Sequence, residues 1–110
     1  MKMPMKKTIN ATLQVLPSGG TKHPYQLVDR AIEAIATSGL KYKVCPFETV
    51  VEGTYDEVMT VFGQAQQACY EAGATSVMAY IKIQSSVDDV SIEDKMEKYE
   101  WIVRDISKCV

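Results

Sequence analysis

KYKVCPFETVVEGTYDEVMTVF, residues 41–62, carries the signals that decide the fold. Two short runs within it, 41–45 and 48–52, are rich in β-branched and aromatic residues and are separated by a Pro-Phe pair, where the chain can turn. They predict a β-hairpin. Directly afterwards, residues 54–57 (TYDE) have the form of a capping box, in which the threonine and glutamate side chains satisfy free amides at a helix start. The stretch therefore predicts two strands followed at once by a helix.

The flanking residues complete this pattern on both sides. Thr8 to Leu16 alternate between apolar and polar side chains, as in a half-buried strand, and the following PSGG run (17–20) is expected to end that strand. A helix is predicted from about Pro24 to Ser38, because apolar residues recur there at spacings of three and four. The second helix keeps this period until Gly73, and Ser76 to Gln84 alternate again as a fourth strand.

The resulting order predicts an α+β fold of the ferredoxin-like β-α-β-β-α-β type, with a four-stranded antiparallel sheet. An added C-terminal helix is expected to open at Ser91, with apolar positions continuing from Met96 to Ile106. At 110 residues, the chain has the size of a single domain, and residues 1–7 are expected to form a loose N-terminal segment.

One face of this sheet is left without a helix, because two helices can cover only the other face. The open face must meet solvent, the third helix or another subunit. The alternation of the strands assigns to it Thr12, Gln14, Met78, Tyr80 and Lys82.

Composition excludes several classes of function. With 46% hydrophobic residues, 24% charged residues and a net charge of -2, the chain is typical of a globular protein and lacks the clustered positive charge of nucleic-acid binders. No apolar run approaches the roughly 18 residues of a membrane span. Three widely spaced cysteines predict neither a disulfide framework nor a zinc site. We expect a cytoplasmic protein without membrane or nucleic-acid partners.

Catalytic chemistry has little support in the residues. His23 is the single histidine and has no nucleophile in a recognisable motif nearby, so it is expected at a helix entry or a ligand contact. Glu48 and Glu52 would lie roughly 13 Å apart along a strand, too far to act as paired acids on one bond. No catalytic residue and no metal ligand is predicted. Glu52, just before Gly53, suits pairing with a cation or with the amino edge of a heterocycle, although a plain surface glutamate is an equal alternative.

Several segments, in their order and spacing, resemble the thiamine-binding protein family, small ferredoxin-like proteins long catalogued as uncharacterised. The resemblance covers about residues 8–98. The segments that carry it are Val15-Leu16-Pro17, His23-Pro24-Tyr25, Ser38-Gly39-Leu40-Lys41-Tyr42, Thr49-Val50-Val51-Glu52-Gly53, Asp56-Glu57-Val58-Met59 and Ile81-Lys82-Ile83.

This resemblance implies binding of thiamine or its hydroxymethylpyrimidine part without turnover, by subunits that associate through their sheets into dimers and tetramers. No cofactor is implied beyond that ligand. The residues expected to bind it are Gln14, Thr49, Glu52 and Tyr80, of which Thr49 and Glu52 lie in a segment that matches the family. In a regular strand these two face opposite ways, so both can line one pocket only across a bulge or from two subunits.

The chain also departs from the usual family pattern, with Ser76 and the turn 84–87 at positions where relatives carry arginine. Such a loss could remove an anion contact. Two other classes of function remain open on this fold: an acylphosphatase-like hydrolase, or an interaction module without a small ligand. The first needs an arginine in the first β-α loop, and residues 17–25 contain none.

Overall fold

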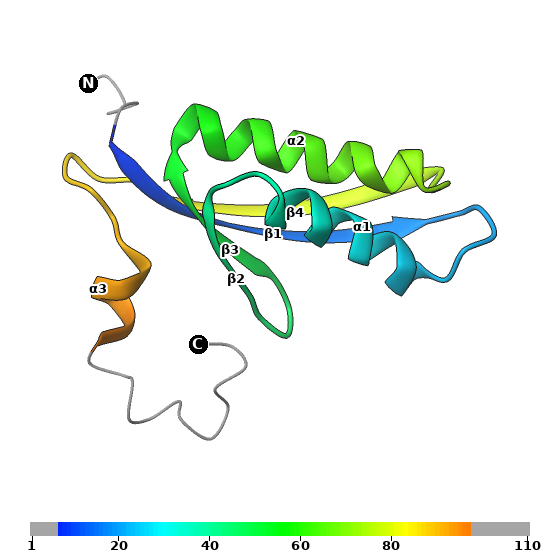
Figure 1. The fold of residues 1–110 in the computed structure, drawn as a ribbon, viewed down its shortest axis with the longest axis horizontal. Coiled ribbons are helices and arrows are strands. Elements are labelled where there is room, and N and C mark those ends of the chain that lie inside the picture. The colour runs from blue at the N-terminus through cyan, green and yellow to red at the C-terminus, as the bar shows by residue number, and fades with distance from the viewer. Residues whose placement is uncertain (1–6, 98–110) are drawn as a thin grey trace.

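Four strands form one antiparallel sheet in the order β2-β3-β1-β4, and two long helices cover one of its faces (Figure 1). The structure is a computed structural model, which describes residues 7–97. In chain order the elements are β1 (Thr8–Ser18), α1 (Pro24–Ala36), β2 (Lys41–Val44), β3 (Thr49–Thr54), α2 (Tyr55–Glu71), β4 (Ser76–Gln84) and α3 (Ile92–Met96). The predicted ferredoxin-like α+β fold is confirmed, because its strand order and antiparallel pairing are those observed.

The central strand β1 is shared between two neighbours. It pairs with β3 from Thr8 to Leu13, and with β4 from Asn10 to Ser18. Asn10 therefore lies opposite Glu52 on one side and Gln84 on the other. This register places the side chains at alternate positions of β1 on opposite faces of the sheet.

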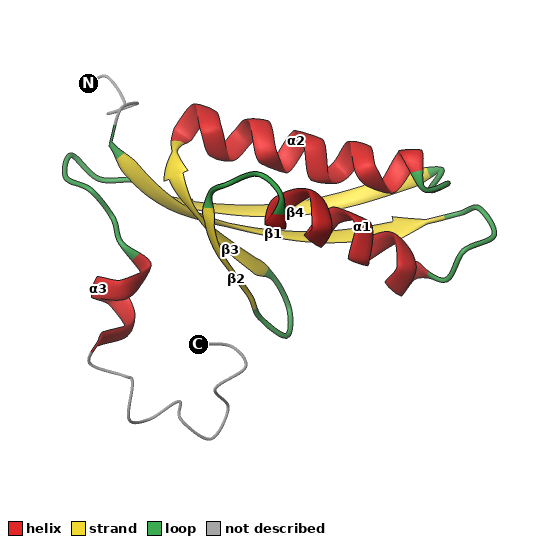
Figure 2. Cartoon of the chain, in the orientation of Figure 1, coloured by secondary structure: helices red, strands yellow, loops and turns green. Residues whose placement is uncertain are grey.

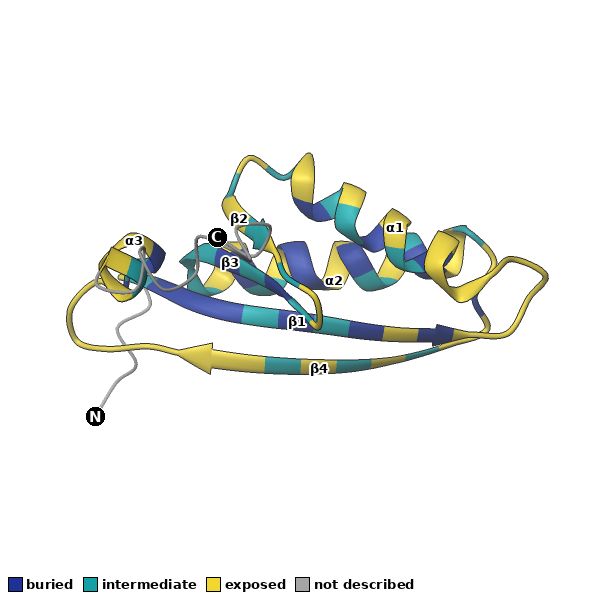
Figure 3. Cartoon of the chain, turned by 90° about the horizontal axis from the view of Figure 1, so that it is seen from below, coloured by how far each residue is buried: buried dark blue, intermediate teal, exposed yellow. Residues whose placement is uncertain are grey.

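The hydrophobic core lies between the sheet and the helices α1 and α2. The apolar side chains of β1 on this face are buried, while the edge strand β4 is largely exposed or half-buried (Figure 3). Seven large side chains have almost no exposed surface: Phe62, Ile9, Leu27, Ile35, Val51, Val58 and Cys69. The alternation in the sequence thus selects the buried face.

Each long helix begins where its sequence predicts. His23 is the N-cap of α1, where its Nδ1 accepts a hydrogen bond from the Tyr25 amide at 3.2 Å. The capping box of α2 is complete: Thr54 Oγ1 accepts from the Glu57 amide, and the Glu57 carboxylate accepts from the Thr54 amide. The Thr54 bonds lower the pKa of the Glu57 carboxyl.

The prediction that the PSGG run ends the first strand is wrong by two residues, because β1 continues through Pro17 and Ser18. Beyond Leu13 the strand β3 no longer pairs with β1, so Pro17 lies where β1 has a single neighbour, β4. Proline is tolerated at such an edge because its missing N–H need not serve a second strand. The chain turns after Ser18 instead, at Gly20, whose φ of +74° is a left-handed conformation that favours glycine.

The short helix α3 lies apart from α1 and α2, beyond the loop that follows β4 (Figure 2). It begins at the predicted cap, Ser91, whose hydroxyl accepts a hydrogen bond from the Asp94 amide. The predicted continuation of this helix toward Ile106, like most of the N-terminal segment 1–7, lies outside the described residues. Within residues 7–97, no helix has the length and apolar character that crossing a membrane requires.

Candidate functional site

The sheet face opposite α1 and α2 carries the side chains that the alternation assigns to it. Met78, Tyr80 and Lys82 alternate with half-buried residues along β4, and Gln14 lies opposite Tyr80. Met78 is 56% exposed and Tyr80 52% exposed, so no element covers this part of the face among the described residues. A binding site on this face is therefore accessible to a ligand or to another chain.

The segment that leads into α3 crosses one end of this open face. Its backbone joins the start of β1: the Val90 amide donates to the Thr8 carbonyl, and the Thr8 amide donates to Asp89 Oδ1, both at 2.8 Å. Val90 and Ile92 are buried, at 8% and 5% exposed. Val90 and Ile92 therefore form a second, smaller apolar contact, on the side of the sheet opposite the main core.

Asn10 and Glu52, neighbours on β1 and β3, hold this segment in place. Asn10 Nδ2 donates to Glu52 Oε1 at 3.2 Å and to the Val90 carbonyl at 3.1 Å. Glu52 Oε1 also accepts the Ile92 amide, at 2.7 Å. Because both partners of Nδ2 are acceptors, the orientation of the Asn10 amide is determined by its contacts. Its Oδ1 is buried and has no hydrogen-bond partner among the described residues.

A pocket of about 400 Å³ opens between this segment and the sheet. Asn10 and Thr12, two positions apart on β1, both line it, and their Cα atoms are separated by about 7 Å. The Thr12 hydroxyl is also buried, and it contributes to lowering the pKa of the Glu48 carboxyl. The full lining is Asn10, Ala11, Thr12, Lys43, Cys45, Val50, Lys82, Ile83, Gln84, Ile92, Lys95 and Met96. The pocket therefore combines apolar walls with two polar residues of β1, Asn10 and Thr12.

Two ion pairs flank the pocket. Lys82 Nζ lies 2.8 Å from Glu48 Oε1, and this contact lowers the pKa of the Glu48 carboxyl. Lys41 Nζ pairs with Glu93 Oε1, which lowers the pKa of Glu93 and raises that of Lys41. Glu48 and Glu93 are thus each paired with a lysine from another part of the chain.

The four residues predicted to bind ligand do not come together. Gln14 and Tyr80 are partners across β1 and β4, and Glu52 contacts the pocket residue Asn10. Thr49 is 5% exposed and pairs with Leu13 on the face that α1 and α2 cover. The pairing of β3 with β1 runs from Thr49 to Glu52 without a bulge, so these two side chains cannot share a pocket within one subunit.

Sequence reasoning did not single out Asn10, although it sits on the polar side of an alternating strand. That position is the signal the sequence offers, since Asn10 precedes Thr12 and Gln14 at a spacing of two. Its burial depends on Val90, which lies 80 residues further along the chain. The sequence alone contains no indication of that contact.

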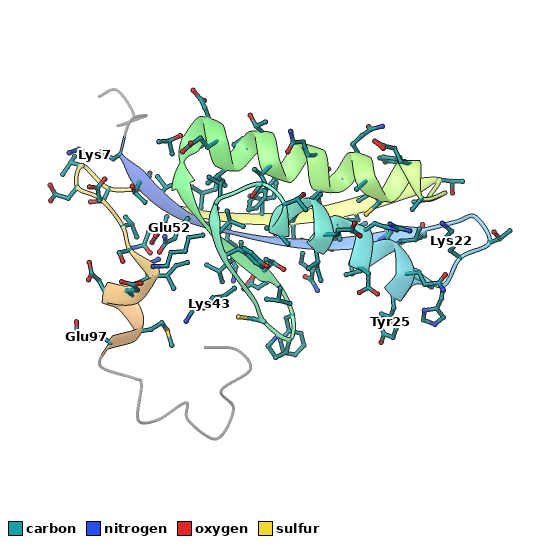
Figure 4. All side chains as sticks on the ribbon, in the orientation of Figure 1. Lys7, Lys22, Tyr25, Lys43, Glu52 and Glu97 are labelled. Carbon is teal, nitrogen blue, oxygen red and sulfur yellow. The ribbon has the colours of Figure 1, made fainter. Side chains whose placement is uncertain are left out.

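The single histidine lies away from this pocket (Figure 4), and no metal-binding cluster is found in the described part of the chain. Tyr25, next to the single histidine, lies at the opposite end of the molecule from Glu52 and Lys43 (Figure 4). Within residues 7–97, no three histidine, cysteine, aspartate or glutamate side chains gather as a metal site would require. The pocket is therefore the candidate site.

The fold and this pocket define a ferredoxin-like α+β protein with a pocket on its open sheet face. A family model described as thiamine-binding protein matches residues 11–100, and the chain belongs to this family. It is 37% identical over 92 residues to a UPF0045 protein of Clostridium perfringens, across 84% of this chain and 97% of the relative.

Solved structures agree with this assignment. A domain of unknown function, DUF77, from Bacillus cereus is 38% identical, with a TM-score of 0.83 over 89% of this chain and 95% of that one. A protein from Thermotoga maritima, described as a candidate thiamine biosynthesis or salvage protein, is 28% identical with a TM-score of 0.76, over 84% of this chain and 98% of that one.

Proposed function

We propose that this chain is a non-catalytic, homo-oligomeric cytoplasmic protein that binds thiamine or a related hydroxymethylpyrimidine compound. The family and the Thermotoga relative support a role connected with thiamine. The observation that carries the proposal is the pocket on the open face, which brings two polar residues of β1, Asn10 and Thr12, together with apolar walls.

An aminopyrimidine matches the polar atoms of these two residues. Its exocyclic amino group is a donor, and its adjacent ring nitrogen is an acceptor. Asn10 Oδ1 can only accept, and the Thr12 hydroxyl can donate. Burying an unpartnered acceptor costs about 1–3 kcal/mol, so a ligand that supplies the missing donor recovers much of that cost on binding. Val50 and Ile92 provide apolar surface for the ring.

Glu52 takes a supporting position in this proposal. Its Oε1 already receives hydrogen bonds from Asn10 and Ile92, so it orients the Asn10 amide and anchors the segment that walls the pocket. In this proposal, Gln14 and Tyr80 make further contacts with the ligand on the exposed part of the open face.

The proposed binding is testable with Thr12→Val, which removes the hydroxyl while keeping the shape and suiting a strand. Isothermal titration calorimetry with hydroxymethylpyrimidine and with thiamine is expected to give saturable binding to the wild type. Thr12→Val is expected to weaken it by about tenfold, the equivalent of about 1.4 kcal/mol. Thr60→Val, on the exposed side of α2, is the matched control and should bind as the wild type does. Absence of saturable binding by the wild type would contradict the proposal.

Self-association is the second part of the proposal. Leu16 and Met78 are partners across β1 and β4, and both are about half exposed, as is Tyr80. These side chains form an apolar patch on the open face beyond the pocket, and a second copy packed sheet to sheet would cover it. Light scattering is expected to give a dimer or tetramer for the wild type and a smaller species for Met78→Glu. A monomeric wild type would refute the proposed self-association and leave the proposed ligand binding unaffected.

A further inference from the structure

Three lysines from three separate elements line the pocket. Lys43 comes from β2, Lys82 from β4 and Lys95 from α3. None of the residues that line the pocket is an aspartate or a glutamate. The fold thus places positive charge from distant parts of the sequence around one small cavity.

Two of these lysines form no ion pair in the described part of the chain. Lys82 is paired with Glu48, whereas Lys43 and Lys95 make no ion pair with any residue in the described range 7–97. Partial burial lowers the pKa of Lys95, and the negative charge of Glu52 opposes that effect. An anion that enters the pocket would supply a further negative charge for Lys95 beside that of Glu52.

Lys43 comes from the sheet and Lys95 from α3, and both line the pocket between these elements. Figure 4 shows Lys43 and Glu52 on the side of the sheet toward α3. Asn10 and Thr12, the polar residues proposed to hold the heterocycle, lie on β1 between β3 and β4. A ligand with a heterocycle at one end and an anionic group at the other would contact both sets. A cavity of about 400 Å³ is large enough for a ligand of this size.

We propose that the pocket selects a phosphate ester of an aminopyrimidine, with Lys43 and Lys95 binding the phosphate while Asn10 and Thr12 bind the ring. This inference rests on the proposed function and specifies the class of ligand. A phosphate monoester carries close to two negative charges at neutral pH, which two ammonium groups can balance. The uncharged alcohol would leave both lysines without an ion-pair partner.

The test compares three ligands by isothermal titration calorimetry: hydroxymethylpyrimidine, its phosphate ester and inorganic phosphate. The wild type is expected to bind the ester at least about tenfold more tightly than the alcohol, because charge-assisted hydrogen bonds are stronger than neutral ones. The double variant Lys43→Gln/Lys95→Gln should lose this preference while its affinity for the alcohol changes by less than about threefold.

The matched control is Lys7→Gln/Lys22→Gln, which removes the same charge from two exposed lysines that do not line the pocket (Figure 4). It is expected to keep the preference for the ester. Circular dichroism checks that both double variants are folded.

Each outcome bears on the inference. Equal binding of alcohol and ester, or a preference that survives in Lys43→Gln/Lys95→Gln, overturns the phosphate assignment and leaves the proposed function standing. Inorganic phosphate binding as tightly as the ester would show an anion site independent of the ring, which also overturns it. If neither the alcohol nor the ester binds, the proposed function fails together with the inference.

Discussion

Replacing Asn10 by aspartate tests how the open face is held together. The substitution changes one NH₂ group into an oxygen and leaves the size of the side chain unaltered. In the wild type that group donates to Glu52 Oε1 at 3.2 Å and to the Val90 carbonyl at 3.1 Å. An aspartate carboxylate can donate neither bond, and it adds a negative charge beside Glu52.

The expected loss follows from these two contacts. The bond to the Val90 carbonyl is a neutral one, worth about 1 kcal/mol, and the bond to the Glu52 carboxylate is charge-assisted, worth about 2 kcal/mol. Asn10→Asp should therefore lower the free energy of unfolding by about 3 kcal/mol at pH 7. With a urea m-value of about 1.5 kcal/mol/M, the denaturation midpoint should fall by about 2 M.

The loss in the free energy of unfolding caused by Asn10→Asp should also depend on pH. Burial and the nearby Glu52 carboxylate raise the pKa of the introduced carboxyl above its ordinary value of about 3.9. Above the raised pKa the introduced carboxyl is charged, so the full loss in the free energy of unfolding is expected there. As the pH falls through that value the carboxyl gains a proton and can donate one hydrogen bond again, so the difference from the wild type should narrow.

Urea titrations followed by circular dichroism at pH 7 and at pH 4 measure both effects. Gln64→Glu, which adds a carboxylate at an exposed position of α2, is the control and should change stability by less than about 0.5 kcal/mol. A loss below about 1 kcal/mol for Asn10→Asp, or one that does not change with pH, would refute the role assigned to Asn10.

Three further outcomes are expected. Gly63→Ala should raise the free energy of unfolding by about 1 kcal/mol in thermal melts, because Gly63 is exposed within α2 and an added Cβ meets nothing within 4 Å. Gly20→Ala should lower it by more than about 2 kcal/mol in the same melts, because the Cβ would lie 2.4 Å from the Gly73 carbonyl oxygen at a φ of +74°. Lys82→Gln should raise the pKa of Glu48 toward its ordinary value in a carboxyl NMR titration. Since the lowered pKa of Glu48 stabilises the fold above its unfolded pKa and this contribution is lost as the pH falls, the variant should also lose less stability on acidification.

The sequence by itself determined the elements and the face of the sheet that stays open. Alternation along β1 and β4, helical spacing in α1 and α2, and the capping box at Thr54 are local patterns, each set by a few neighbouring residues. The order of these elements matches the observed fold, because the β-α-β-β-α-β pattern has few ways to bury its apolar faces. The family followed from the same residues.

Only the tertiary structure decided how the site is built. Asn10 acquires its role from Glu52, 42 residues away, and from Val90, 80 residues away. Lys43 and Lys95 line one pocket only because the segment leading into α3 crosses one end of the open face. Such contacts depend on strand register and on where a distant segment docks, and neither is encoded in the propensities of neighbouring residues. The polar residues of β1 could therefore be placed on a face from sequence, while their partners could not.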